Sequence, residues 1–146
     1  MEHIFVGGAY FMMENSTIEN YKEIAKILGE KFNNYKIYTP LDIEKFRQNY
    51  IKNNPNANKN QIDSAMVEYD LDLVKTSKLF VVDVTNKSLG VGIELGTVKN
   101  SETKVVLVAK FDSPISDMVT GAFPQQKVNF YNDEKQLKNI LKSINL

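Results

Sequence analysis

The residues best suited to chemistry in this chain are two carboxylates on either side of one apolar run. Glu94 follows the run 78–84 and stands in the glycine-rich segment Ser88-Leu-Gly-Val-Gly-Ile-Glu-Leu-Gly96. Asp70 precedes the run, near the end of a segment with helical periodicity. The run is short, β-branched and aromatic, which is typical of a buried parallel strand. Because ligands bind where such strands turn into the next helix, this pattern predicts a site that contains both acids.

The two acids are expected to lie in different environments. A helix starting near Gly92 would place Glu94 in its first turn, where free backbone N–H groups and the helix dipole favour the ionised carboxylate. Asp70 shares a helix face with Met66 and Leu73, and this apolar setting would raise its pKa. Such a pair suits glycosidic-bond chemistry, in which one acid is the nucleophile and the other protonates the leaving group. The alternative interpretation is that Glu94 only stabilises its helix and that Asp70 is a solvated surface charge.

The turn before Glu94 offers groups that could hold a sugar or a phosphate. The hydroxyl of Ser88 and the amides of Gly90 and Gly92 could bind a sugar hydroxyl or an anion. The glycine spacing fits neither the phosphate loop nor the dinucleotide-binding motif. The alternative is that Ser88 is an ordinary turn residue.

A second glycine turn follows the first apolar segment of the chain. The segment Gly7-Gly-Ala-Tyr-Phe11 combines Gly7 and Gly8 with two aromatic residues, Tyr10 and Phe11. These rings could form a stacking platform for a flat heterocycle. The alternative is that they only pack against the core or its rim.

Composition limits the remaining function classes. The 146 residues fit one domain, 1–146, with 18 basic and 18 acidic residues in balance, so the chain has no electrostatic footprint for nucleic-acid polymers or anionic membranes. There is no cysteine and only one histidine, His3, so neither a metal site nor thiol chemistry is expected. No apolar run approaches the length of a membrane span, and a cytoplasmic protein is expected.

Strand and helix patterns alternate along the chain. This alternation predicts an α/β fold with a doubly wound five-stranded parallel sheet and helices on both faces. The expected strands are 3–6, 36–39, 79–84, 104–109 and 128–131, and the expected helices are about 17–28, 61–76, 92–100, 134–144 and a short turn at 116–121. The polar segment 53–60 is expected to be an exposed loop, either a plain surface loop or a flexible lid over the ligand-binding edge.

These residues resemble the nucleoside 2-deoxyribosyltransferase family, which includes the 2′-deoxynucleoside 5′-phosphate N-hydrolases. The resemblance covers nearly the whole chain and is most specific from Asp70 to Gly96, where Ser-Leu-Gly-Val-Gly-x-Glu-Leu-Gly is similar to the N-hydrolase branch. Two other segments, Phe5-Val-Gly-Gly-Ala-Tyr-Phe11 and Tyr38-Thr-Pro-Leu-Asp42, are more similar to the transferase branch. The second segment places Asp42 among the expected substrate-binding residues.

The resemblance implies a flavodoxin-like fold and a retaining double displacement that needs no cofactor. It implies that Glu94 attacks C1′ of deoxyribose to form a covalent ester and that Asp70 protonates the departing base. Tyr10 and Phe11 would line the base pocket, and Ser88 would bind the 5′ end of the sugar. Ser116 and Met118 match residues that family members insert into a neighbouring subunit's site, which implies a homo-oligomer with shared active sites.

The chain departs from the family pattern at two positions. Phe5 stands where the family has a tyrosine that orients the nucleophile, and Tyr10 stands where the N-hydrolases have a phosphate-binding arginine. In the opposite sense, Ser88 replaces an aspartate of the transferases, and a serine does not repel phosphate. The replacements at Tyr10 and Ser88 favour opposite branches. Because no arginine stands at the first-strand turn to bind a phosphate, we expect a nucleoside 2-deoxyribosyltransferase. The alternatives are a deoxynucleoside 5′-monophosphate N-hydrolase and, from another class, a non-catalytic nucleotide-binding module.

Overall fold

Five strands of this chain form one parallel sheet. The computed structural model describes residues 1–8 and 17–146, apart from the side chains of Thr17 and Ile18. The strands are β1 (His3–Gly8), β2 (Lys36–Tyr38), β3 (Leu79–Asp83), β4 (Lys104–Lys110) and β5 (Asn129–Tyr131). Their order in the sheet is β2-β1-β3-β4-β5, and every hydrogen-bonded pair is parallel. This is the flavodoxin-like order, so the predicted α/β fold class is confirmed.

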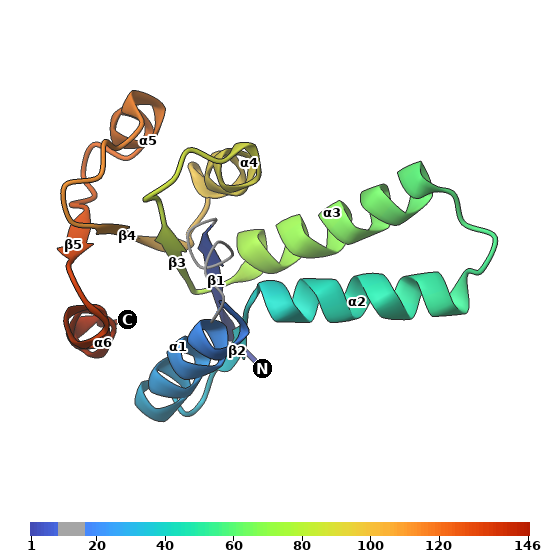
Figure 1. Ribbon diagram of the computed structural model, residues 1–146, viewed down its shortest axis with the longest axis horizontal. Coiled ribbons are helices and arrows are strands. Elements are labelled where there is room, and N and C mark those ends of the chain that lie inside the picture. Colours follow the sequence, from blue (N-terminus) through green and yellow to red (C-terminus); the bar gives the residue numbers. More distant parts are fainter. Residues whose placement is uncertain (9–16) are drawn as a thin grey trace.

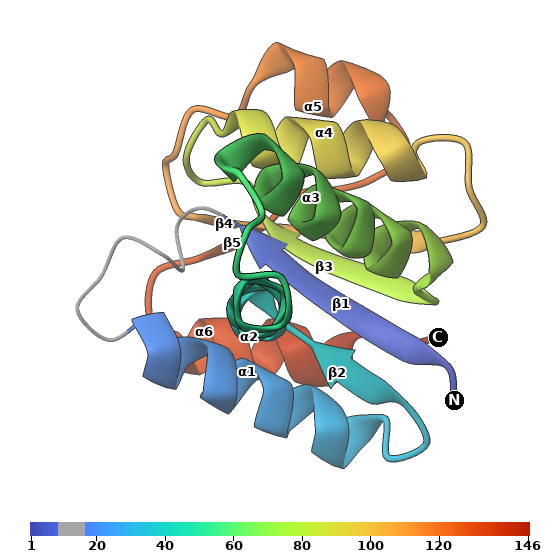
Figure 2. The same ribbon diagram turned by 90° about the vertical axis from the view of Figure 1, so that its right-hand side faces the viewer.

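Helices cover both faces of the sheet (Figures 1 and 2). The helices are α1 (Thr17–Lys31), α2 (Pro40–Asn53), α3 (Lys59–Thr76), α4 (Leu89–Val98), α5 (Asp117–Ala122) and α6 (Glu134–Ser143). One core cluster joins α1 and α6 to one face, and the other joins α3 and α4 to the opposite face. The two faces arise because successive residues of a strand point to opposite sides.

Strand β3 lies at the centre of the sheet and feeds the candidate site. All five of its residues are buried, as expected for a parallel strand covered on both faces. Its register pairs Gly7 with Val82 and Gly8 with Asp83, so the carboxyl ends of β1 and β3 lie side by side. The segment that carries the chain from Asp83 to α4 therefore starts beside the glycine pair of β1.

Helix α2 is not among the elements predicted from the sequence. Pro40 suggests a turn, but proline is also favoured in the first turn of a helix. Thr39 and Asp42 form a capping box, in which Asp42 Oδ2 accepts from the Thr39 N–H at 2.9 Å. The carboxylate of Asp42, an expected substrate-binding group, is thus engaged in capping this helix.

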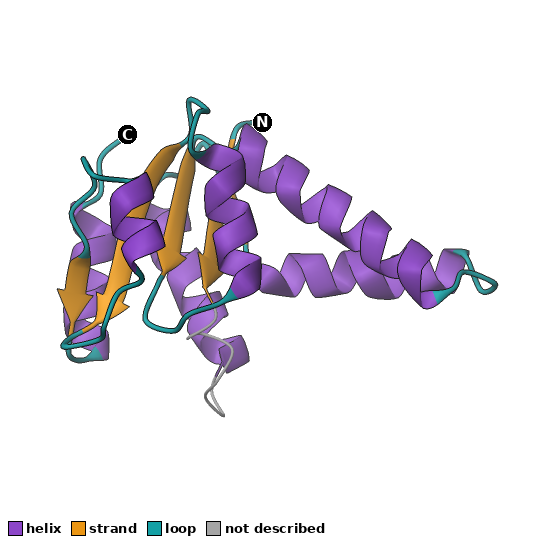
Figure 3. Ribbon diagram, turned by 90° about the horizontal axis from the view of Figure 1, so that it is seen from above, coloured by secondary structure: helices purple, strands orange, loops and turns teal. Residues whose placement is uncertain are grey.

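Helices α2 and α3 form a hairpin that projects away from the sheet (Figures 1 and 3). The rings of Phe46 and Tyr69 stack between them at 4.1 Å with an interplanar angle of 8°. The segment 54–58 joins the helices at the far end of the hairpin and is mostly exposed. The exposed loop predicted there is confirmed, but it lies away from the strand ends, so the structure favours the surface loop over the lid.

Within the described ranges 1–8 and 17–146, no helix combines the length and apolar character that a membrane span requires.

Candidate active site

Glu94 lies deeper in its helix than the sequence suggests. Helix α4 begins at Leu89, and Ser88 is its N-cap, with Ser88 Oγ accepting from the Val91 N–H at 3.4 Å. The prediction of a helix start at Gly92 is therefore wrong, because Leu89 and Gly90 continue the helix that Ser88 caps. Glu94 is the sixth helical residue rather than a first-turn residue, so the free N–H groups of the helix start cannot stabilise its anion.

Burial controls the protonation of Glu94. Loss of solvent raises its pKa from 4.5 to about 8, and the negative charge of Asp70 contributes to the same shift. The expectation that Glu94 is ionised by the helix dipole is thus not met. Burial also raises the pKa of Asp70, while its interaction with Glu94 lowers it. The two carboxyl groups are therefore neighbours that hold one proton between them near neutral pH.

A glycine of β1 provides the space for the Glu94 carboxyl group. A Cβ atom at Gly7 would lie 3.1 Å from Glu94 Oε2 and 2.9 Å from Cε2 of the Phe80 ring. Any larger residue at position 7 would have to displace one of these two groups. Gly7, named from the sequence as a substrate-binding turn residue, thus positions Glu94 against the end of the strand.

One oxygen of Glu94 has unused hydrogen-bonding capacity. Oε2 is buried and lacks a hydrogen-bond partner within the part of the chain that the structure describes. Buried polar atoms are nearly always paired, so an orphaned one marks a strained or functional site. This oxygen is available to a ligand that enters beside Asp70.

The amino end of α4 borders a cavity of about 640 Å³ between α4 and α5. Ser88 lines this cavity together with Ser116 and Met118 of the same chain, and Lys87 and Lys99 add positive charge. Ser116 occupies the N-cap position of α5 without a side-chain cap, and the Met118 side chain is 81% exposed. Gly92 lines it too, so the structure places four of the sequence-predicted site residues around one cavity.

The two helix glycines of the turn differ in what they offer a ligand. The Gly92 N–H donates to the Ser88 carbonyl at 3.0 Å, so this amide is not available to a ligand in the structure. Gly90 is the second residue of α4, where a backbone N–H has no acceptor within the helix. Of these two glycine amides, only that of Gly90 can therefore join Ser88 in holding an anion.

Tyr10 and Phe11 lie outside the described residues. Gly8 is described and adopts φ +136°, a conformation that favours glycine. Its carbonyl accepts a hydrogen bond of 3.1 Å from the hydroxyl of Tyr21 on α1. Gly8 therefore shapes the end of β1.

Two residues at this edge were missed by sequence reasoning. Tyr21 is buried, and its pKa is raised by burial and by the charges of Glu94 and Asp83. Phe5, at the position of the family tyrosine, has no hydroxyl and packs against Phe80 with 5.7 Å between the ring centroids. The hydroxyl that interacts electrostatically with Glu94 belongs instead to Tyr21 on α1. Asp83 is a carboxylate within an apolar run, and that mismatch is the sequence signal that could have identified it.

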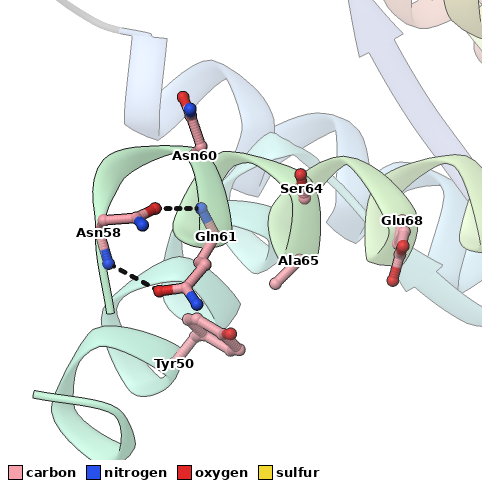
Figure 4. Close-up of a pocket in the computed structure, with 7 residues that line it drawn as sticks. All are labelled: Tyr50, Asn58, Asn60, Gln61, Ser64, Ala65 and Glu68. Atoms are coloured by element: carbon pink, nitrogen blue, oxygen red, sulfur yellow. Dashed lines mark hydrogen bonds between the residues drawn. The ribbon is translucent and has the colours of Figure 1, made fainter. Parts of the chain in front are cut away.

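A second, open pocket of about 380 Å³ lies on the hairpin, lined by Tyr50 and six residues around the start of α3 (Figure 4). The side chains of Asn58 and Gln61, which line it, each already accept a hydrogen bond of 2.9 Å from the other's backbone N–H in a capping box. Over residues 1–8 and 17–146, no three His, Cys, Asp or Glu side chains are grouped closely enough to hold a metal ion. The chemistry of the described chain is therefore concentrated at the carboxyl edge of the sheet.

Comparisons with known proteins show the fold of this chain. No family model matches it, and no curated protein matches it in sequence. A CMP N-glycosidase of Clostridium botulinum, BcmB, superimposes with a TM-score of 0.63 at 18% identity, covering 94% of this chain and 96% of the other. A conserved protein from Enterococcus faecalis V583 superimposes with a TM-score of 0.64 at 14% identity, covering 97% of this chain and 98% of the other. The chain thus shares its fold with these proteins over nearly its whole length.

Proposed function

We propose that this protein cleaves the N-glycosidic bond of 2′-deoxynucleosides through a covalent deoxyribosyl–Glu94 intermediate and transfers the sugar to another nucleobase. The observation that carries the proposal is the buried pair of Glu94 and Asp70, in which Glu94 Oε2 has no partner among the described residues. A site that only binds an anionic ligand gains nothing from two neighbouring acids. The likeness in fold to a CMP N-glycosidase supports the same bond as the target.

The pair holds the one proton that the first step needs. In the free protein the two acids share this proton. As substrate binds, the proton passes to Asp70 and leaves Glu94 as the carboxylate. Glu94 then attacks C1′, the C1′–N bond breaks, and Asp70 gives its proton to the departing base. The products of this step are the free base and the deoxyribosyl ester of Glu94.

The second step reverses the roles of the two acids. The acceptor base approaches C1′, Asp70 removes its proton, and the ester bond to Glu94 breaks. This sequence restores both the carboxylate and the shared proton. The absence of an arginine near the turn favours a neutral nucleoside as substrate, because Arg47, the single arginine of the sequence, lies on α2 beside Glu44 at 3.6 Å.

Hydrolysis of deoxynucleoside 5′-monophosphates is the second candidate function. Lys87 and Lys99 line the same cavity as Ser88 and could offset the charge of a phosphate. The protein BcmB, whose solved structure has a similar fold, is by its name an enzyme that acts on a nucleoside monophosphate, CMP. In this case water replaces the acceptor base, and Asp70 takes the proton of that water.

We also propose that the active form is a homo-oligomer whose sites are completed by a neighbouring subunit. The exposed Leu89, Ile93 and Met118 side chains give α4 and α5 an apolar surface beside the Ser88 cavity. Ser116 and Met118 would then reach a second copy as well as their own cavity. Mixing an inactive Glu94 variant with an inactive Ser116 variant should restore part of the activity, whereas an active monomer would contradict the proposal.

Two incubations separate the candidate functions. With deoxyinosine and adenine, a transferase yields deoxyadenosine and hypoxanthine. With a deoxynucleoside monophosphate alone, an N-hydrolase yields free base and deoxyribose 5-phosphate. We expect base exchange in the first mixture, measured by liquid chromatography. Rapid hydrolysis of the monophosphate without base exchange would select the second candidate, and no base release from either mixture would contradict both.

A further inference from the structure

Asp83 is a buried carboxylate that the proposed chemistry does not use. Within residues 1–8 and 17–146 it is the only acidic side chain that is fully buried, with 0% exposure. Strand alternation places it with Leu79 and Val81 on the face covered by α1 and α6. Glu94 lies across the opposite face, beside Gly7. A buried carboxylate is costly, so its retention at this edge calls for a specific role.

Asp83 is held from two neighbouring segments. Its Oδ1 accepts a hydrogen bond of 2.8 Å from the Thr85 N–H, and its Oδ2 accepts one from the hydroxyl of Tyr131 on β5. These bonds lower a pKa that burial raises. Thr85 is fixed in turn, because its Oγ1 accepts from the Lys110 N–H at 2.8 Å. Asp83 therefore links the ends of β3, β4 and β5.

The end of β1 packs directly on Asp83. A Cβ atom at Gly8 would lie 2.7 Å from Asp83 Cβ and 2.8 Å from its carbonyl oxygen. The Gly8 carbonyl is itself held by the Tyr21 hydroxyl at 3.1 Å. These contacts fix the position of Asp83, at the end of β3, relative to β1, β4 and β5. A rigid support for a site requires such a fixed position.

The chain that leaves Asp83 leads to the cavity between α4 and α5, which Ser88 lines. The bond from Asp83 to the Thr85 N–H closes the first turn after β3. Asn86, Lys87 and Ser88 follow and line the cavity between α4 and α5. The position of Ser88 therefore depends on the path of the backbone after β3, which the hydrogen bond between Asp83 and the Thr85 N–H fixes.

We propose that Asp83, held by Tyr131, is a positioning residue that aims the turn 84–88 at the 5′ end of the substrate. The proposal rests on the proposed function, because it assigns Ser88 to that end of the sugar. Asp83 itself does not touch substrate. It acts through Thr85 and the turn, so its loss should weaken substrate binding more than it slows bond cleavage.

The test is the variant Tyr131→Phe, which removes the hydroxyl donor and keeps the ring. An Asp83→Asn variant is less clear, because its amide could donate to Tyr131 and rebuild the bond. KM should rise about tenfold for the active substrate, which is the nucleoside with its 5′-hydroxyl or the monophosphate. A tenfold change corresponds to the loss of one hydrogen bond to a charged group. We expect kcat to stay within about twofold and KM for the matching 5′-deoxy analogue to stay unchanged.

Thr103→Val is the matched control for loss of a buried hydrogen bond. The Thr103 hydroxyl donates to the Ser77 carbonyl at 3.0 Å beside the opposite end of β3, far along the strand from the turn. This variant should lose thermal stability, by roughly 2–6 °C, with KM unchanged. If Tyr131→Phe does not fold, Thr85→Val, which removes the acceptor of the Lys110 N–H, should raise KM in the same selective way.

The outcomes distinguish the inference from the proposed function. An active wild type with unchanged KM in both Tyr131→Phe and Thr85→Val would overturn the role of Asp83 alone. A KM increase of equal size for the 5′-deoxy analogue, or in Thr103→Val, would assign Asp83 to fold stability and overturn the role as well. A wild type that releases base from no substrate would contradict the proposed function and the inference together.

Discussion

Two acids at the same edge of the sheet, the fully buried Asp83 and the partly buried Glu94, have opposite hydrogen-bonding states. Asp83, on the face covered by α1 and α6, accepts from the Thr85 N–H and the Tyr131 hydroxyl. Glu94, on the other face, has a buried Oε2 without a partner among the described residues. Burial raises the pKa of both, but hydrogen bonds oppose the shift at Asp83, whereas the charge of Asp70 increases it at Glu94.

This contrast matches the two proposed roles, with Asp83 as the acid that supports the site and Glu94 as the acid that reacts. A carboxylate with satisfied oxygens is stable where it is and holds its neighbours in place. A carboxyl group with an orphaned buried oxygen destabilises the free protein, and the substrate can satisfy it. The fold therefore retains an unfavourable group at Glu94 and a fixed one at Asp83, and the predictions below test that division.

The largest effect is expected at Glu94. Glu94→Gln should lower the rate of base release by about 10⁴-fold or more, because the amide cannot act as the proposed nucleophile toward C1′. Glu102→Gln, on the exposed loop after α4, is the control and should keep wild-type activity. Initial rates measured by chromatography decide the matter. Near-normal turnover in Glu94→Gln would remove the double displacement.

Asp70→Asn should slow base release by about 10²- to 10⁴-fold, most strongly for bases that leave poorly without a proton. In the wild type, the rate should fall as the pH rises through about 8, because the pair then loses its one proton. In the variant this basic limb should disappear, since Asp70 no longer supplies the proton. A pH–rate profile unchanged by the substitution would make Asp70 a structural residue.

Gly7→Ala should reduce activity by about 10²-fold, because its Cβ would lie 3.1 Å from Glu94 Oε2 and force the carboxyl group aside. Gly29→Ala on α1 is the matched control, with only Ile37 Cγ1 near the new Cβ, at 3.9 Å. That control should gain up to about 1 kcal/mol of helix stability and keep its activity. Equal activity in the two variants would show that Gly7 does not position Glu94.

The smallest effect is a change in stability with pH. The folded state raises the pKa of Glu94 from 4.5 to about 8, so the protein loses stability as the pH rises through this interval. Glu94→Gln cannot ionise and avoids that loss. Its Tm should exceed that of the wild type by a few degrees at pH 9, and the difference should shrink toward pH 5. A difference in Tm between Glu94→Gln and the wild type that does not change with pH would mean that the folded state does not raise the pKa of Glu94.

Much of the fold could be predicted because it depends on patterns that are local in the sequence. The apolar runs and their alternation with helical segments predict the five parallel strands, and the structure confirms them. Helix α2 was missed because Pro40 is equally compatible with a turn and with a helix start. The choice between them is made by the capping box and by the stacking of Phe46 on Tyr69, a contact between residues far apart in the chain.

The candidate site could be predicted only in part. Asp70 and Glu94 were identified together because they flank one strand, and the structure makes them neighbours. Their protonation was not predictable, since the pKa of Glu94 depends on its burial in the folded chain and on its closeness to Asp70. The hydrogen bonds of Tyr131 to Asp83 and of Tyr21 to Gly8 were missed because they join elements that only the folded sheet brings together.

The central claim is that Glu94 forms a covalent ester with the substrate sugar, and mass spectrometry of the quenched protein tests it most directly. The wild type is mixed with a 2′-deoxynucleoside, stopped with acid during turnover, and measured as the intact chain and as peptides. We predict a mass increase of one deoxyribosyl group, located on Glu94 and absent from Glu94→Gln. Base release without any adduct on Glu94, or an adduct on Asp70 or Asp83 instead, would contradict the account.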